Sequence, residues 1–511
     1  MKLTPHRTGP PERTDKRSMV ATLLFGLIFL GFVEESPLET DVVLYHGLWR
    51  SVFVVFAPLF TSLPGISISP WQILLFVLVP FCLRTSGTIQ QRSREMHRAI
   101  FVSVVCIAVT FLWGLARGGS AYFAYYQVWH FMAALLIAYL LMSAMRTERD
   151  LVSLGKIVVL AALIRATLCI YFFWTYLYGK PLPLGDYVTN HDDSMLWVVA
   201  TLILLIWAVL KGGRGTWTIA GLGVPSMLYA MVLNNRRIAW VELLLAALLT
   251  YFLMGAGPLR SRINRWAIRA SPVALIYIVA GLGSDSAVFA PVHALMTTGS
   301  NYDASSLTRL EEDRNLLHTL FDIGNPILGT GWGRPYDKLE SYYSNYAPGW
   351  ILYLYTPHNS LLGLAVFSGL VGVIGIWGVV TMGAYLAARG YRASTDLVPR
   401  AAGLAALCSL AAYSAHCYGD IGLQSFAGAL IFGAALATAG KVAAWGEALP
   451  SAHTAPTQAE DGHPQPVPRF AYRNGMTPQR HYEPSSPKPG PSAGNDVTRK
   501  PGRAPMRRPS R

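Results

Sequence analysis

The sequence HNSLLGLAVFSGLVG, residues 358–372, opens an apolar run that continues to about residue 388. His358 and Asn359 begin this run directly after a proline, and Gly369 and Gly372 lie within it at helical spacing. A run of this length can cross a bilayer as a helix. Small residues on such a helix allow a neighbouring helix to approach closely. The stretch therefore predicts one long transmembrane helix whose polar N-terminal end is held in a fixed position.

Composition assigns the rest of the chain to the same class. The 511 residues are 52% hydrophobic and 14% charged, and apolar runs recur along most of the sequence. One soluble core cannot bury that much apolar surface, so the chain reads as an all-α polytopic membrane protein. The net charge of +14 then reflects basic residues collecting on the cytoplasmic side, and no nucleic-acid partner is needed to explain it. The five cysteines lie in or beside apolar runs without metal-ligand spacing, and we expect no metal.

The pattern of apolar runs predicts about 12 transmembrane helices with both ends in the cytoplasm. Residues 42–63 are ambiguous, because charged residues and a proline interrupt them, and are interpreted as interfacial or re-entrant. Residues 260–269 are expected to form a basic cytoplasmic loop. The expected order is a cytoplasmic N-terminus (1–18), nine transmembrane helices (19–283), a large, partly helical periplasmic loop (284–357), three transmembrane helices (358–441) and a disordered, basic, proline-rich cytoplasmic tail (442–511).

Arginines occur at two unusual places for a membrane protein, on the predicted outer side and in the middle of a span. Arg236 and Arg237 lie in a tight turn on the predicted outer side, against the positive-inside bias, which indicates an anionic ligand. The alternative is that they reach lipid phosphates or pair with Glu242 one turn further on. Arg165 lies in mid-span and should face the bundle interior, where it either lines a lipid-phosphate groove or pairs internally.

The predicted periplasmic loop contains further candidates. Leucines at helical spacing predict an amphipathic helix over 305–322 that carries Arg309 and Arg314. Each arginine has an acidic residue within one turn, Asp313 and Glu311, so simple pairing on the helix surface is the alternative to ligand binding. The glycine-rich residues 326–333 lack the strand and the Lys-Ser/Thr of a nucleotide-binding loop and are interpreted as a close-packed turn.

His358 is the candidate base of this region. Its ordinary pKa near 6.5 allows it to accept a proton from a hydroxyl or to donate a hydrogen bond at the outer surface, although a purely structural role is the alternative. The segment from His191 to Asp193 is expected to be a solvated loop, with metal or sugar binding as its other interpretation. Loop aromatics suit either stacking on sugars or a membrane-interface belt. These aromatics are Trp332, Tyr336, Tyr342, Tyr343, Tyr346 and Trp350.

These features together resemble the O-antigen ligase and polysaccharide polymerase superfamily, which includes the Wzy-type polymerases. The motifs that carry the resemblance are the outer arginine turn, an arginine in the long loop, Pro-x-x-Gly-x-Gly-x-Gly and His-Asn-x9-Gly-x-x-Gly. The likeness is clearest over residues 227–372 and extends more weakly over 19–440. Family ligases often have leucine four positions after the arginine, whereas Val241 follows Arg237 here. Which of Arg236 and Arg237 is functional therefore stays open.

The resemblance implies glycosyl transfer from a polyprenyl-diphosphate-linked glycan to a sugar hydroxyl, at the periplasmic face of a bacterial inner membrane and without metal, nucleotide or other cofactor. Arg237 and Arg309 would stabilise the diphosphate and His358 would act on the hydroxyl, with inversion at the anomeric carbon. Expected substrate-binding residues are Arg236, Arg314, Asn359 and Arg165. Expected partners are the lipid-linked donor, the glycan acceptor, the bilayer and a chain-length regulator.

Surface-polysaccharide polymerisation of the Wzy type is the expected activity, with ligation of glycan to a lipid A core as the alternative within the same enzyme class. Outside that class, a polysaccharide transporter should show corresponding broken helices in two halves, and no internal repeat is found. A structural partner in an envelope assembly would not need the outer arginines or His358.

Overall fold

The computed structural model describes residues 19–34, 69–85, 93–179, 188–284, 286–297, 304–339 and 352–445. Within these ranges the protein is helical and contains no strand, which confirms the all-α class. The predicted ambiguous segment 42–63 and the N-terminal residues 1–18 lie outside the described residues. Residues 442–445, which the sequence assigned to the tail, are the end of α16, and the rest of the predicted tail, residues 446–511, lies outside the described residues.

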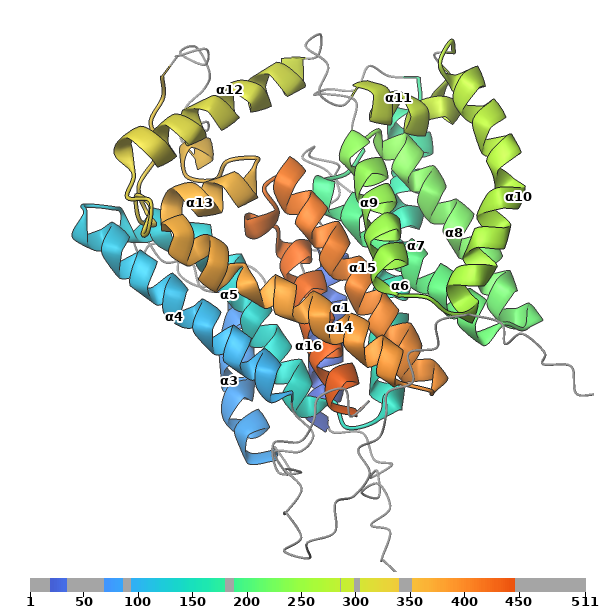
Figure 1. The fold of residues 1–511 in the computed structure, drawn as a ribbon, viewed down its shortest axis with the longest axis horizontal. Coiled ribbons are helices and arrows are strands. Elements are labelled where there is room, and N and C mark those ends of the chain that lie inside the picture. Colours follow the sequence, from blue (N-terminus) through green and yellow to red (C-terminus); the bar gives the residue numbers. More distant parts are fainter. Residues whose placement is uncertain are drawn as a thin grey trace, which may run out of the picture. The chain divides into compact units, whose positions relative to one another are not determined.

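Figure 1 shows the described residues as a bundle of long helices, with α12 lying across one end above α13. The helices are α1 (Met19–Glu34), α3 (Pro70–Thr85), α4 (Arg94–Ala116), α5 (Ala121–Ala144), α6 (Glu148–Phe172), α7 (His191–Lys211), α8 (Arg214–Asn234), α9 (Arg237–Leu253), α10 (Pro258–Gly281), α11 (Ala290–Thr297), α12 (Ala304–His318), α13 (Ser360–Leu370), α14 (Gly378–Ala393), α15 (Leu397–Gly419) and α16 (Phe426–Trp445). Short π-helical and 3-10 segments are η3 (Phe173–Leu177), η4 (Ala287–Phe289), η5 (Thr319–Ile323), η7 (Val371–Ile376) and η8 (Gly422–Gln424).

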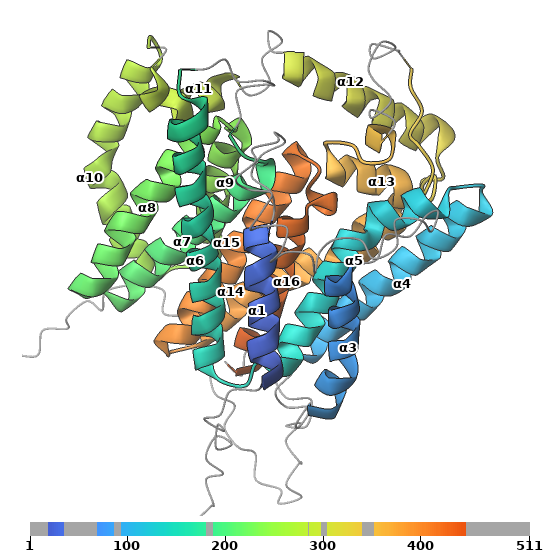
Figure 2. The same cartoon turned by 180° about the vertical axis from the view of Figure 1, so that it is seen from behind.

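Eight of the described helices are long and apolar enough to cross a membrane, counting α6 with η3 and α13 with α14 as single helices. Shorter apolar helices cover 19–33 and 70–83. The protein is therefore a multi-pass membrane protein, and the predicted total of about 12 spans stays a prediction. In the centre of the bundle, α16 packs against α5, α14 and α15 and is buried along almost its whole length (Figure 1). Figure 2 shows α1 between α5 and α6 on the opposite side.

The prediction of a basic loop over 260–269 is wrong, because these residues are the first half of α10. Pro258 begins that helix at a position where its missing N–H costs nothing. The Arg262 guanidinium donates to the Val209 carbonyl at the end of α7, and Arg392 of α14 donates to the Leu253 carbonyl at the end of α9. These contacts bring the basic helix ends together at one end of the bundle. Described residues of that end include Arg94, Arg146, Arg149, Lys211, Arg214, Arg260, Arg262, Arg389, Arg392 and Arg400.

The glycine-rich turn, residues 326–333, lies against α4 and α13. The Trp332 indole is buried and donates to the Thr110 hydroxyl of α4 at 2.8 Å. Gly329, Gly331 and Gly333 all have positive φ angles, between 66° and 87°, which glycine adopts without strain. The interpretation of this segment as a close-packed turn is confirmed.

The helix predicted as one continuous span from His358 is interrupted at Gly369, where φ is 56° and ψ is −153°. The glycine-rich turn fills the interruption. Its Thr330 and Gly331 N–H groups donate to the carbonyls of Val366 and Phe367 at 2.8 and 3.0 Å. In return, the carbonyls of Pro326 and Ile327 accept from the N–H groups of Leu370 and Val371, both at 3.0 Å. Gly369 therefore admits this turn rather than the neighbouring helix expected from the Gly369/Gly372 spacing.

Gly369→Ala is expected to destabilise the folded protein by about 1–3 kcal/mol, because alanine at this φ is strained and its Cβ would meet backbone atoms of Ile327 and Gly329 about 2.6 Å away. The measurement is the melting temperature of the purified variant in detergent. Gly378→Ala is the matched control, since a Cβ there meets nothing within 4 Å. Equal melting temperatures for Gly369→Ala and the control would contradict this prediction.

Candidate functional site

Polar and charged side chains gather at the end of the bundle opposite the basic helix ends. The N-termini of α7, α9 and α13 and the C-terminus of α15 meet there, with α12 crossing above α13 (Figure 1). His358, Glu312 and Asp420 come from three different segments of this end, and the charges of Glu312 and Asp420 both act on His358. The candidate site is therefore assembled from parts of the chain that are far apart in sequence.

His358 is held from two sides. One Glu312 oxygen accepts hydrogen bonds from both the backbone N–H and Nδ1 of His358, each at 3.1 Å. The Tyr353 ring stacks on the imidazole, with ring centroids 5.0 Å apart. Burial lowers the pKa of His358, but the hydrogen bond and charge of Glu312, together with the charge of Asp420, raise it by more, so the pKa lies above its ordinary value. Because Glu312 occupies Nδ1, Nε2 is the nitrogen that can accept a proton from a substrate.

Helix α12 presents Arg309 to the same place. Arg309, Glu312 and Asp313 are three and four residues apart, so they share one face of α12. The Asn359 amide donates to Asp313 at 3.1 Å and caps α13 by accepting from the Leu362 N–H. The Asn359–Asp313 bond and the two Glu312–His358 bonds thus fasten α12 to the start of α13, and the Arg309 charge acts on both Asp313 and His358.

The simple helix-surface pairs suggested by sequence are not among the described ion pairs. Asp313 bonds to Asn359, and neither Arg309 with Asp313 nor Arg314 with Glu311 lies within ion-pair distance in the described residues. Arg314 is exposed, unlike the half-buried Arg309. The orientation of α12 therefore favours Arg309 over Arg314 as the residue nearest His358.

The arginine turn joins the site through Arg236. Its Nη1 lies 2.7 Å from Nε2 of His191, and the other His191 nitrogen, Nδ1, pairs with the buried Asp420 carboxylate. His191, His416 and His358 all lie near enough to Asp420 to lower the pKa of its carboxyl, against the effect of burial. Arg237 begins α9 and is half-buried.

The expectation of a solvated loop at 191–193 is wrong, because these residues form the first turn of α7 and both aspartates are buried. Asn190 caps the helix by accepting from the Asp193 N–H at 3.1 Å. Asp193 forms a two-pronged ion pair with Arg165 of α6, with N–O distances of 2.7 and 2.8 Å. Arg165 is thus paired inside the bundle, the second of the two positions considered from sequence.

A buried histidine links α7, α9 and α15 beneath these residues. His416 lies between two carboxylates, with Nδ1 2.7 Å from Glu242 and Nε2 3.3 Å from Asp192. Asp420 directly follows the last residue of α15, and its N–H donates to the His416 carbonyl. The His416 contacts therefore fix the end of α15 that carries Asp420, and Glu242 has His416 as its described partner.

Several of these residues are absent from the set predicted by sequence. Asp420 is a single acidic residue directly after an apolar helix, and His416 is one histidine inside an apolar run, whereas Glu312 lies between Glu311 and Asp313 within α12. For Asp420 and His416 the available signal was an ionisable residue in or beside an apolar run, since ionisable residues within membrane segments are costly and commonly functional. Glu312, one of three consecutive acidic residues, carried no such signal. Their partners, however, lie more than 40 residues away along the chain, and nothing in the local sequence identifies them.

The loop aromatics divide into two groups. Trp332 and Tyr336 are buried and belong to the core of the protein. Tyr342, Tyr343, Tyr346 and Trp350 lie outside the described residues. Sugar stacking by the last four stays a prediction.

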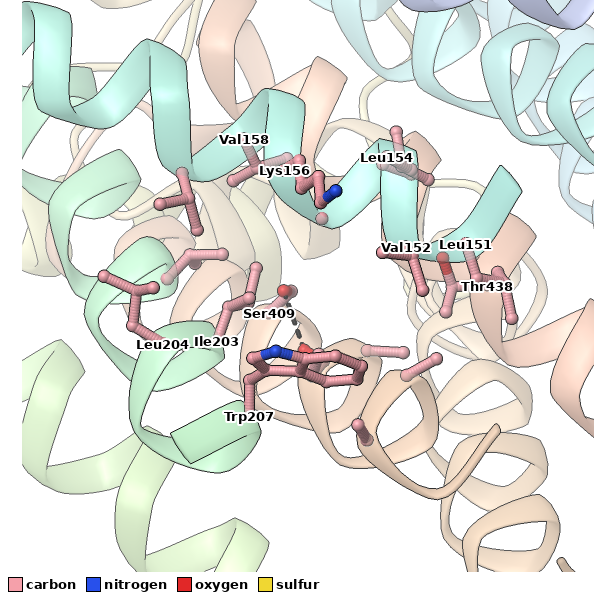
Figure 3. A pocket seen from close by; sticks show the side chains of 18 of the residues that line it. Leu151, Val152, Leu154, Lys156, Val158, Ile203, Leu204, Trp207, Ser409 and Thr438 are labelled. Carbon is pink, nitrogen blue, oxygen red and sulfur yellow. Dashed lines mark hydrogen bonds between the residues drawn. The ribbon is translucent and has the colours of Figure 1, made fainter. Parts of the chain in front are cut away.

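A separate cavity of about 330 Å³ lies between α6, α7, α15 and α16, toward the basic end of the bundle. Figure 3 shows Leu154, Val158 and Trp207 among its mainly apolar lining, with Lys156 beside it. The Ser409 hydroxyl already donates to a carbonyl of its own helix at 2.8 Å. The cavity suits hydrocarbon rather than a sugar or phosphate, and it is distinct from the polar site.

A comparison with known protein families matches part of this chain. Residues 222–377 match the family model Wzy_C, described as O-antigen ligase. These residues form an O-antigen ligase domain. No curated protein sequence matches the chain. The family match and the apolar helices together support an O-antigen ligase or polymerase type of membrane enzyme of polysaccharide or lipopolysaccharide biosynthesis.

The O-antigen ligase domain contains Arg236, Arg237, Arg309, Glu312 and His358. Other residues of the site lie outside the matched segment, since Arg165 and His191 precede it and His416 and Asp420 follow it. The site is completed by helices on both sides of the domain. Among the described residues, no group of three or more His, Cys, Asp or Glu side chains has a geometry that could hold a metal ion.

Proposed function

We propose that the protein transfers glycan from a polyprenyl-diphosphate-linked donor to a sugar hydroxyl, extending a surface polysaccharide. The observation that carries this proposal is the Glu312–His358 pair, with the Arg309 charge close to it. A base and a cation at one place meet the two needs of the reaction: removing the hydroxyl proton and stabilising the departing diphosphate.

The reaction forms one bond and breaks one. The acceptor oxygen attacks the anomeric carbon, and the bond from that carbon to the diphosphate oxygen breaks. The hydroxyl proton passes to His358 Nε2, while Glu312 at Nδ1 stabilises the imidazolium that results. The released lipid diphosphate then takes up the proton. A single displacement of this kind inverts the anomeric centre.

The departing diphosphate needs positive charge that does not depend on pH. Arginine stays protonated and binds phosphate oxygens with paired donors, so Arg309 and the arginine turn suit this role. Arg309 acts from α12, and Arg236 or Arg237 acts from the start of α9. On this proposal Asn359 and Asp313 set the position of α12 relative to His358.

We expect the site to face the periplasm across a bacterial inner membrane. Basic residues concentrate at the opposite end of the bundle, at the turns that join α5 to α6, α7 to α8 and α14 to α15. Basic loops favour the cytoplasmic side, which supports a periplasmic position for His358 and its neighbours.

Polymerase and ligase activities differ in the acceptor, and product length distinguishes them. The experiment supplies purified protein with a single-repeat polyprenyl-diphosphate oligosaccharide, either alone or with lipid A core. A ladder of lengthening lipid-linked glycan from donor alone supports the polymerase. Product formed only when lipid A core is present would replace it with the ligase. No transfer in either reaction would contradict the enzyme proposal.

Glu312→Gln is expected to lower the rate and to move the acid limb of the kcat/KM profile to lower pH. Activity requires neutral His358, so it is lost as pH falls through the His358 pKa, which Glu312 raises. Removing the carboxylate removes that upward shift. The profile is measured from about pH 5 to 9, a range that brackets ordinary histidine titration. Asp322→Asn, beside the more distant His318, is the matched control. An unmoved limb in Glu312→Gln would exclude this role of Glu312.

A further inference from the structure

The Arg236 guanidinium is held by acceptors on the segment that leads into α7. Its Nη1 lies 2.7 Å from His191 Nε2, and its Nη2 donates to the Thr189 carbonyl at 3.4 Å. A guanidinium has five N–H donors and no acceptor. His191 must therefore accept through Nε2.

This bond decides where the proton of His191 lies. With Nε2 accepting, the imidazole carries its proton on Nδ1, the nitrogen paired with Asp420. Asp420 is almost fully buried, and its carboxylate pairs with that nitrogen. The order Asp420–His191–Arg236 thus runs from a fixed carboxylate through a neutral histidine to an arginine. Each member restricts the orientation of the next.

Asn234, just before the arginine turn, holds the segment that leads into α7. Its side chain is fully buried, and its Oδ1 accepts from the backbone N–H groups of Val188 and Thr189 at 3.1 and 2.7 Å. Its amide nitrogen donates to the Ser194 hydroxyl at 3.1 Å. Because Asn235 then turns the chain with a φ of 48°, Arg236 is brought back over the residues that Asn234 holds. His191 and the Thr189 carbonyl, which contact Arg236, are therefore held in fixed positions.

We propose that His191 is a positioning residue that orients Arg236 toward the diphosphate of the donor. This inference rests on the proposed function and adds to it that Arg236, rather than Arg237, is the phosphate-binding arginine of the turn. His191 acts through Arg236 and does not touch the reacting atoms. Its Asp420-bound nitrogen sets the ring orientation, much as outer carboxylates orient metal-binding histidines.

The test is a double-mutant cycle read as affinity for farnesyl diphosphate, a short polyprenyl diphosphate, on the purified full-length protein. His191→Phe is expected to weaken binding about 10- to 100-fold, the range for one hydrogen bond to a charged group. His191→Gln should restore much of the affinity, because its amide can donate to Asp420 and accept from Arg236. In an Arg236→Ala background, His191→Phe should add little further loss. In an Arg237→Ala background, its full effect should remain.

Three results would overturn the inference: wild-type affinity in His191→Phe, an undiminished effect of His191→Phe on the Arg236→Ala background, or no binding of the diphosphate by the wild-type protein. Melting temperatures show whether His191→Phe is folded, and His191→Gln provides the second, conservative variant. Binding separates this inference from the proposed function. A wild-type protein that binds the diphosphate with the expected coupling but transfers no glycan would support the role of His191 and contradict the transferase.

Discussion

Replacing His358 by alanine is expected to slow glycan transfer by about 10²- to 10⁴-fold, the usual contribution of a general base. The fall should appear in kcat, because the histidine acts on the hydroxyl during bond formation rather than in donor binding. The measurement is transfer by purified protein, together with the lipid-linked glycan pool in a strain whose own gene is deleted. Accumulated donor with lost surface glycan is the expected result in cells.

His318→Ala provides the matched control for this variant. His318 ends α12, pairs with the exposed Asp322 at 2.6 Å, and has no described contact with His358. It tests whether losing any histidine from this region disturbs the protein. Normal transfer by a folded His358→Ala protein would remove the base from the proposed mechanism and favour a structural partner in an envelope assembly.

Replacing Arg309 by alanine is expected to reduce kcat by about 10²- to 10³-fold, the usual effect of losing one group that stabilises transition-state charge. The physical reason is that the departing diphosphate gains negative charge as its bond to the sugar breaks. Arg309→Lys should recover part of the rate, because a charge remains while the paired donors are lost. Rates at saturating donor separate this effect from weaker binding.

Arg314→Ala is the control on the same helix. Arg314 is exposed and lies five positions further along α12, so it points away from the face that carries Arg309 and Glu312. Its loss should change the rate by less than about threefold, as is usual for an exposed charge with no tight partner. Similar rates for Arg309→Ala and Arg314→Ala would show that the orientation of α12 does not select between them.

The cavity near Lys156 and the polar site differ in chemistry and in position. The cavity is lined by apolar residues from α6, α7, α15 and α16, whereas the polar site lies at the other ends of α7 and α15 (Figures 1 and 3). Hydrocarbon suits the first and charged groups suit the second. A donor with both a long apolar chain and a diphosphate needs both kinds of surface, which is consistent with the proposed substrate class.

The sequence by itself determined the class of the protein, the amphipathic helix that carries Arg309, the close-packed glycine-rich turn and the candidacy of His358. These features depend on local periodicity, on glycine spacing and on the cost of charge in apolar segments, all of which can be read along the chain. The segment that matches the O-antigen ligase family, residues 222–377, contains the helix that carries Arg309, the glycine-rich turn and His358.

Only the tertiary structure decided how the site is assembled. Glu312 reaches His358 across 46 positions, Asp420 reaches His191 from the far end of α15, and the turn at 326–333 enters the interruption at Gly369. Ion pairs and backbone contacts of this kind depend on helices packing side by side, so residues distant in sequence become neighbours. Periodicity fixes which face of a helix is apolar, but the partner of a buried charge is set by the neighbouring helix that the fold places against it.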